Sequence, residues 1–420
     1  MKIAIVGAGF TGLAAGLKLL KAGHQVTIFE KDSLPGGLAV GFKDPKWQWT
    51  LEKHYHHWFT NDDKILTLAK EIGCSVLIKR PETSVYVNDK FYKLDSPSDV
   101  LKFPELSLFQ RLRMGLTLAL LKYNPFWKMF EQYRASDFLS KMMGEKPYKI
   151  LWEPLLVKKF GPFAYNISLA WFWARIVKRT PSLAYPEGGF LEFANAITLI
   201  IRKRGGEVLF NNEIKKIGTG KNETVEIDGL IFDKVVVTLP TSLFVQITSQ
   251  LPTDYKRKLL DLKEIGAINL ILRLKKPFFQ DNTYWLNVCN PKFPLTAIVE
   301  HTNFMEKKYY NNEHLVYLGN YLPNDHPFMH MNKEELLKTY DSSLIKINKT
   351  YKSNLIDSHL FSDAFAQPII PVNYSKIIPP FKTPLKNVYL ASMQQVYPWD
   401  RGTNYAVELG EKVADAILEP

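Results

Sequence analysis

The stretch MKIAIVGAGFTGLAAGLKLLKAGHQVTIFEKDSLPGG forms residues 1–37 and decides the fold. An apolar strand is predicted at Lys2–Val6, and the G-x-G-x-x-G turn Gly7–Gly12 leads from it into a helix predicted at Leu13–Ala22. A second strand is predicted at Gln25–Phe29. In such a turn the first glycine permits the tight bend, the second lets the main chain approach a pyrophosphate, and the third lets helix and strand pack closely. Because the helix N-terminus also presents free N–H groups to an anion, this order of elements predicts a dinucleotide site.

An acidic residue ends the second predicted strand. Glu30 follows Gly12 by eighteen residues. A carboxylate at this point can accept hydrogen bonds from both hydroxyls of a ribose. The residues that we expect at the nucleotide in this part of the chain are Gly7, Gly9, Phe10, Thr11, Gly12, Glu30 and Lys31.

A second glycine pair, Gly36-Gly37, stands six residues beyond Glu30. Together with the first turn, it resembles the extended fingerprint of FAD-binding proteins of the amine oxidase, protoporphyrinogen oxidase and phytoene desaturase superfamily. The resemblance implies FAD as the cofactor and an α/β fold, in which a glutathione-reductase-like Rossmann domain binds FAD and an α+β substrate domain is interleaved with it. It also implies that Gly36, Gly37 and Leu38 lie at the cofactor. Leu38 departs from the family, in which a basic residue is common at this position.

The C-terminal segment resembles the closing flavin motif of the same superfamily. A strand predicted at Val388–Leu390 is followed by a helix predicted from about Asn404 to Leu418. The resemblance implies that this helix points its N-terminus at the flavin, where oriented N–H groups stabilise negative charge on the reduced ring. Ser392-Met393 departs from the Gly-Asp that the family usually has. The further cofactor residues that the resemblance implies are Arg401, Gly402, Thr403 and Asn404, with Ile214 holding adenine through its main chain.

With 420 residues, of which 46% are hydrophobic, the chain exceeds one ordinary domain and can bury a sizeable core. Alternating predicted strands and helices indicate a parallel sheet in the nucleotide domain, while Ile268–Leu274 and His314–Gly319 are predicted to be antiparallel strands. We expect an FAD-binding domain at 1–60, 188–240 and 380–420, and a substrate domain at 61–187 and 241–379 with a helical cap at about 100–180.

The segment His54-Tyr55-His56-His57 has the most unusual composition of the chain. Similar histidine-bearing segments line the flavin in UDP-galactopyranose mutases, so the resemblance places these residues near the isoalloxazine ring. His56 and His57 are catalytic candidates that could relay protons, and Tyr55 is a candidate for substrate binding. The alternative is that the histidines only pack against the ring. Strand geometry would point His54 and His56 to one side and His57 to the other, and we predict no metal site.

A lysine typical of amine oxidases is missing. In those enzymes a Lys eight residues before the Pro of a K-x-P-F-type strand ending holds a water at flavin N5, and here that position is Asn269. Asn269 is therefore a third catalytic candidate, and its identity argues against simple amine oxidation. Arg175 and Arg179, one helical turn apart, are predicted to share a face that could clamp a diphosphate or carboxylate, unless it is only a solvated basic face. Trp399 is expected to wall the substrate pocket.

The chain carries a net charge of +12, yet it has no nucleic-acid-binding motif, so we predict no nucleic-acid partner. Within residues 101–134, the apolar run Met114–Leu121 is flanked by six Lys and Arg residues but by only two acidic residues. We expect this segment to be a helical cap with Leu and Phe packed inward, while a basic amphipathic helix on a membrane surface is the alternative. The first strand leaves no room for a signal peptide, so a cytoplasmic protein is expected. The sequence does not indicate the oligomeric state.

These features predict an FAD-dependent oxidoreductase that transfers a hydride between a small organic substrate and flavin N5. A UDP-galactopyranose mutase-like isomerase acting on a nucleotide sugar is the first alternative, favoured by the histidine segment and the arginine pair. A flavin-binding protein without turnover is the second alternative.

Overall fold

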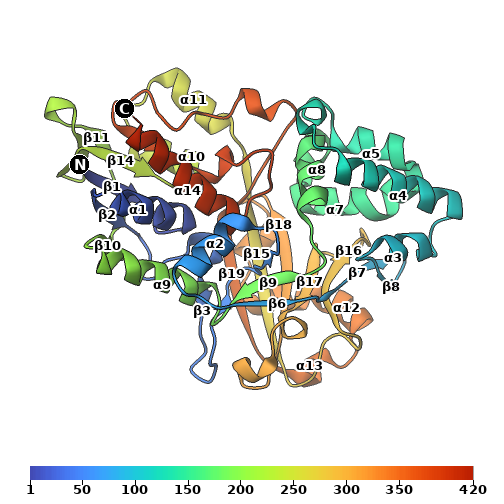
Figure 1. Cartoon of the computed structure of the whole chain (residues 1–420). Helices are drawn as coiled ribbons and strands as arrows, with labels where there is room; N and C mark the ends of the chain where they lie inside the picture. The colour runs from blue at the N-terminus through green and yellow to red at the C-terminus, as the bar shows by residue number, and fades with distance from the viewer. Residues whose placement is uncertain (420) are drawn as a thin grey trace.

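The structure is a computed structural model that describes residues 1–419. Its nucleotide sheet is parallel, with the strand order β10, β2, β1, β14, β20 (Figure 1). Segments far apart in the sequence supply these strands, which confirms the predicted α/β class. The strands are β1 (Lys2–Val6), β2 (Gln25–Phe29), β10 (Glu207–Leu209), β14 (Lys234–Val237) and β20 (Val388–Leu390).

The two faces of this sheet carry different layers, because successive residues of a strand point to opposite sides. Ile3 and Ile5 of β1 pack under helices, while Ala4 and Val6 pack under a small antiparallel sheet. The helical layer consists of α1 (Phe10–Lys21), α9 (Phe190–Lys203) and α14 (Thr403–Leu418), with α2 (Asp63–Glu71) against α14. The opposite layer consists of β11 (Ile217–Thr219), β12 (Val225–Ile227), β13 (Leu230–Phe232), α10 (Thr241–Ile247) and α11 (Thr253–Asp261).

A second, larger sheet has the order β19, β15, β18, β17, β16, β7, β8. The predicted antiparallel pairing within it is confirmed, since Ile268 lies opposite Asn320 and Leu274 lies opposite His314. The division of the chain into two domains stays a prediction. The strands are β7 (Glu82–Val87), β8 (Lys90–Lys93), β15 (Glu264–Leu274), β16 (Thr283–Val288), β17 (Ala297–Glu300), β18 (His314–Leu322) and β19 (Leu355–Pro368), covered by α12 (Lys333–Ile347) and α13 (Tyr351–Asn354).

Short strands connect the two large sheets. The pair β3 (Gly41–Phe42) and β4 (Leu51–Glu52) is antiparallel, and β9 (Leu183–Pro186) pairs with both β5 (Trp58–Phe59) and β6 (Val76–Lys79). The histidine segment is a loop between β4 and β5 rather than a strand.

A helical lobe lies on the side of the molecule away from the nucleotide sheet (Figure 1). Lys122 ties two of its helices together, because its Nζ donates to the carbonyls of Ile176 and Val177 at the end of α8. The helices of the lobe are α3 (Pro97–Lys102), α4 (Leu108–Tyr123), α5 (Ala135–Met143), α6 (Glu145–Pro147), α7 (Glu153–Phe160) and α8 (Leu169–Lys178), with the short 3₁₀ helix η2 (Trp127–Phe130) after α4.

The expectation that the Leu and Phe residues of 101–134 pack inward is wrong for α4. Met114, Thr117 and Leu121 face the interior of the lobe, and they already fill the space there. A second apolar row lies on the outer side and is 46% to 72% exposed, consisting of Leu108, Phe109, Leu112, Leu116 and Leu120. Among residues 1–419, no helix has the length and apolar character to cross a bilayer.

Candidate active site

The first glycine turn and the second glycine pair lie against each other. The main chains of Gly9 and Gly36 form a parallel bridge, and the N–H of Gly36 donates to the carbonyl of Ala8 at 3.0 Å. Gly36 has a φ of +119°, which favours glycine because a Cβ strains this conformation. A Cβ on Gly37 would lie 3.2 Å from the Cα of Gly9. A side chain at Gly37 would therefore crowd the contact between the second glycine pair and the first glycine turn. The predicted pyrophosphate segment is therefore lined by main chain alone.

Helix α1 presents its N-terminus to the same place. Its cap residue Gly9 has no capping side chain, and no acidic residue stands in the first turn, where Phe10 and Thr11 lie. The N–H groups of this turn are therefore available to an anion. A Cβ on Gly12 would lie 2.0 Å from the carbonyl oxygen of Gly7, which explains why the third glycine is needed for the packing of this helix against the turn.

The buried carboxylate of Glu30 is held by main-chain donors. Its Oε2 accepts from the N–H of Ala8 at 2.7 Å, and its Oε1 accepts from the N–H of Asp32 at 3.0 Å. These bonds fix the carboxylate beside the glycine turn, where lone pairs remain for a ribose. Lys31 is exposed, and Ile214 is buried in the core beneath the sheet.

At the predicted flavin site, the C-terminal helix α14 offers the N–H groups of its first turn, because the side chains of its first two residues bind other parts of the protein. Thr403 Oγ1 accepts from Trp58 Nε1 at 2.8 Å, and Asn404 Oδ1 accepts from the N–H groups of Lys64 and Ile65 in α2. Both predicted cofactor side chains are therefore engaged by the protein. No side chain caps α14, and a Cβ on Gly402 would meet no atom within 4 Å. The helix N-terminus thus faces open space.

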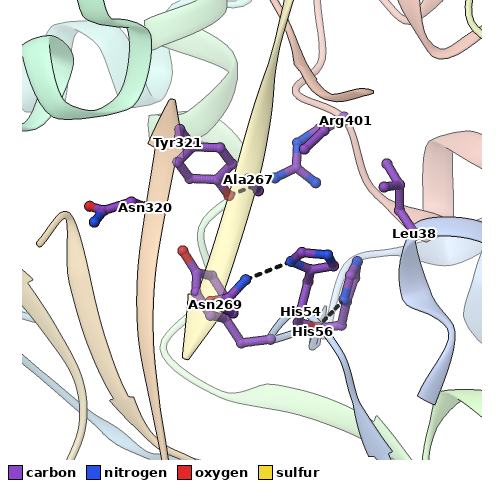
Figure 2. Close-up of a pocket in the computed structure, with 10 residues that line it drawn as sticks. Leu38, His54, His56, Ala267, Asn269, Asn320, Tyr321 and Arg401 are labelled. Carbon is purple, nitrogen blue, oxygen red and sulfur yellow. Dashed lines mark hydrogen bonds between the residues drawn. The ribbon is translucent and has the colours of Figure 1, made fainter. Parts of the chain in front are cut away.

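A cavity lies between these segments and the larger sheet (Figure 2). In this first cavity, residues from the glycine region, the histidine segment, strands β15 and β18 and the loop before α14 come together. Its lining residues are Leu38, His54, Tyr55, His56, Ala267, Asn269, Asn320, Tyr321, Ala366 and Arg401.

His54 and His56 both line the first cavity (Figure 2), and their hydrogen bonds indicate opposite tautomers. The amide Nδ2 of Asn269 donates to His54 Nδ1 at 2.6 Å, which leaves the ring proton of His54 on Nε2. His56 Nδ1 donates to the carbonyl of His54 at 2.6 Å, which leaves its Nε2 as an acceptor. Burial lowers the pKa of His54 to about 3 and that of His56 to about 4, so both rings are neutral at pH 7.

The third histidine lies elsewhere. His57 Nδ1 lies 3.2 Å from the hydroxyl of Tyr284, and the ring packs against Trp285 outside the lining of the first cavity. His57 therefore lies apart from the lining of the first cavity, and its choice as a catalytic candidate stays a prediction. His54 lines the first cavity together with His56, on the same side, as strand geometry would place them.

A glycine makes room for two of the predicted site residues. A Cβ on Gly319 would lie 2.7 Å from Tyr55 Cε1 and 2.8 Å from Asn269 Oδ1. Tyr55 also packs edge-on against Trp285, with ring centroids 4.8 Å apart. Asn269 Oδ1 is buried without a hydrogen-bond partner among the described residues, so it is free to accept from a bound molecule.

Positive charge gathers at the side of the first cavity next to α14. Arg401 Nη2 donates to the hydroxyl of Tyr321 at 2.6 Å, and Lys159 Nζ lies 4.4 Å from the centroid of the same ring. Burial opposes ionisation of Tyr321, but the charges of Arg401 and Lys159 outweigh it and lower its pKa to about 8. Tyr321 and Lys159 were not among the predicted site residues, because only the fold brings them to Arg401.

The two arginines of the predicted clamp lie in different surroundings, and their role in binding an anion stays a prediction. Arg175 makes an ion pair with Asp400, whose other oxygen accepts from Trp171 Nε1 at 2.9 Å. Arg179 directly follows the last residue of α8, and its helical φ of −62° keeps its Cβ one turn from Arg175. Arg175 is thus neutralised by a neighbour, and Arg179 is exposed.

A second cavity of about 370 Å³ lies at the C-terminal end of α4. Trp399, a predicted substrate residue, forms part of its wall and stacks between Trp173 and Tyr405. Because Trp399 precedes Arg401 by two residues, one loop borders both cavities. The lining residues are Lys122, Tyr123, Asn124, Pro125, Trp127, Trp173, Val177 and Trp399.

Comparison with known proteins identifies the class. A family model described as flavin containing amine oxidoreductase matches residues 10–418, and the chain belongs to this family. Hydroxysqualene dehydroxylase of Zymomonas mobilis is 23% identical over 60% of this chain and 65% of its own, and 1-hydroxycarotenoid 3,4-desaturase of a Flavobacterium species is 23% identical over 54% and 53%. The chain thus matches less than two thirds of the length of either relative. Reduced UDP-galactopyranose mutase has the same fold, with a TM-score of 0.77 and 15% identity over 99% of this chain and 95% of that one.

These findings confirm the superfamily and the flavin cofactor that the sequence resemblance implied. The main-chain cradle at Gly9 and Gly37, the uncapped N-termini of α1 and α14 and the unpartnered oxygen of Asn269 fit an FAD that runs from the glycine turn to the first cavity. The individual contacts of the predicted cofactor residues stay predictions.

Proposed function

We propose that the protein is an FAD-dependent oxidoreductase that takes a hydride from a largely apolar organic substrate. The observation that carries the proposal is the second cavity, where Trp127, Trp173 and Trp399 offer aromatic walls next to the residues of the first cavity. Such walls can hold the apolar part of a substrate. The names of two relatives refer to a hydroxysqualene and a hydroxycarotenoid, and these isoprenoid chains match an aromatic cavity.

FAD, when bound, supplies the hydride acceptor at N5 of the flavin. The protein must then receive the proton that a dehydrogenated substrate also loses. His56 Nε2 suits this task, because the ring is neutral and its other nitrogen is fixed on the carbonyl of His54. His54 offers a donor at Nε2, which can orient a substrate oxygen.

A nucleotide-sugar isomerase is a second candidate, favoured by the positive charges of Arg401 and Lys159 beside the first cavity. The pairing of Arg175 with Asp400 weakens it, because that arginine is no longer free for a diphosphate. The oxidoreductase therefore has the stronger support.

An anaerobic titration of the flavin-loaded protein separates these candidates. A long-chain hydroxylated isoprenoid in detergent should bleach the oxidised-flavin absorbance, whereas a uridine diphosphate hexose should not. Trp399→Ala should raise the substrate concentration needed for half-maximal bleaching. Tyr165→Ala should leave that concentration unchanged, because Tyr165 is exposed and lines neither cavity.

Two results would contradict the proposal. Saturable binding of the nucleotide sugar, without binding of any apolar substrate, would favour the isomerase. A stable flavin spectrum that no substrate class changes would indicate a flavin-binding protein without turnover.

A further inference from the structure

We propose that the outer face of α4, together with η2, docks on an anionic phospholipid surface and that the second cavity opens toward this surface. The docking part does not depend on the reaction. The use of the cavity as the access route for an apolar substrate rests on the proposed function.

The outer face of α4 has the wrong polarity for contact with water. Leu108, Leu112, Leu116 and Leu120 recur every four residues and form one row along the helix. Phe109 and Leu116 are each 72% exposed. Helices on the surface of globular proteins normally turn their apolar stripe inward, and α4 already has such an inner stripe. The outer row therefore needs another apolar environment.

The apolar row continues beyond the end of the helix. Tyr123, the last residue of α4, is 83% exposed, and Phe126 and Met129 in the turn and 3₁₀ helix that follow are 71% and 50% exposed. A tyrosine such as Tyr123 is typical of the interface between lipid and water, because its ring is apolar and its hydroxyl can remain hydrated, while Phe126 and Met129 are purely apolar. Helix α4 lies at the outer edge of the lobe, away from the nucleotide sheet (Figure 1), so a flat surface can reach it.

The charges of the segments before and after α4 favour an anionic surface over a neutral one, with Lys102 at the end of α3, Lys128 in η2 and Arg134 before α5. Lys102, Lys128 and Arg134 are exposed, and within the described part of the chain they make no ion pair, in contrast to Lys149 of the same lobe, which pairs with Glu145. Positive side chains next to an apolar helical face attract anionic headgroups while the apolar side chains enter the lipid. A protein partner with an apolar groove would not require this surplus of positive charge.

The second cavity lies where this face ends. Tyr123, Asn124 and Pro125 contribute to its lining and directly follow the exposed row, while Trp173 and Trp399 form walls deeper in the protein. An apolar molecule that leaves the lipid next to Tyr123 would meet Trp399 and then the loop that carries Arg401. The route would avoid bulk water.

The test is sedimentation of the flavin-loaded protein with vesicles of phosphatidylcholine, with and without phosphatidylglycerol. The double variant Phe109→Ser/Leu116→Ser should reduce the vesicle-bound fraction by about tenfold or more, since two large apolar side chains no longer enter the lipid. Leu199→Ser/Leu230→Ser is the matched control, because these residues are 53% and 50% exposed on the nucleotide domain, and it should bind like the wild type. Binding should also weaken when phosphatidylglycerol is omitted or salt is raised.

Several outcomes would overturn the docking proposal. One is that the wild type stays in the supernatant with anionic vesicles at low salt. Another is that the Phe109/Leu116 variant binds as well as the control. A wild-type dimer that this variant dissociates, without vesicle binding, would assign the face to a second copy of the chain. Flavin bleaching by a detergent-dispersed substrate is measured separately, so a failure of docking is distinguishable from a failure of the proposed reaction.

Discussion

Replacing Gly12 by alanine should loosen the nucleotide turn. The new Cβ would lie 2.0 Å from the carbonyl oxygen of Gly7, and this separation must open to at least 3.0 Å, since real Cβ atoms do not approach more closely. The obstructing atom belongs to the main chain, so α1 and the turn must move apart by about 1 Å, and such overpacking costs about 1–3 kcal/mol. Because Gly9 and the N-terminus of α1 move with the helix, FAD affinity should fall by about tenfold or more, as each 1.4 kcal/mol is a factor of ten.

Two other glycine-to-alanine variants provide controls in helices. At Gly16 the new Cβ would meet Ile28 Cδ1 at 2.8 Å, a terminal methyl group that can rotate away, so a small change is expected. At Gly115 the nearest atom is 3.9 Å away, and alanine should stabilise the helix by about 0.5–1 kcal/mol. Denaturant unfolding and FAD titration of the apoprotein measure both effects. If Gly12→Ala matches Gly115→Ala in stability and in FAD affinity, the steric reasoning is refuted.

Three further variants probe the buried polar groups. Burial raises the pKa of Glu52 to about 7, so stability should fall as the pH rises from about 5 to 7, and Glu52→Gln should remove this slope in unfolding experiments; an unchanged slope would assign it to another group. Tyr321 should ionise near pH 8 in ultraviolet difference spectra, and Arg401→Gln should raise that midpoint because a nearby positive charge is lost; a midpoint that stays near 8 would exclude the arginine as its cause. Asn269→Leu leaves Nδ1 of His54 without its donor, and the rate of flavin bleaching should fall by about tenfold or more. Asn269→Gln should restore part of the rate, and full activity of the leucine variant would remove Asn269 from the site.

The nucleotide turn was predictable because its residues act through local geometry. Gly9 and Gly12 matter for the side chains they lack, since a Cβ on either would face main-chain atoms of the same 37-residue stretch, and Gly36 matters for its positive φ. The roles of Thr403 and Asn404 were not predictable, because their partners Trp58 and Lys64 are 345 and 340 residues away in the sequence. Sequence resemblance located the helix, and the structure shows that its first two side chains bind β5 and α2, while a contact of the helix with the flavin stays a prediction.

The outer row of α4 was misjudged for a related reason. The helix carries apolar residues on two sides, and a helical periodicity cannot tell which side meets neighbours. Met114 and Leu121 were as good candidates for the core as Leu112 and Leu116. The choice depends on the residues of α5 and α8 that lie against one side, and these come from later segments of the chain.

The charges around the first cavity act on the histidines as well as on the cofactor. Arg401 stands directly before the N-terminus of α14, so a fixed positive charge and a helix dipole meet where negative charge on a reduced flavin would be stabilised. Burial first, and then the charge of Arg401, lowers the pKa of His56, although its hydrogen bond to the carbonyl of His54 opposes the shift. The arginine that would stabilise an anion on the cofactor therefore also keeps the imidazole unprotonated. A lower pKa also makes the imidazole a weaker base, so in the proposed dehydrogenation the positive charge favours hydride acceptance and opposes proton acceptance.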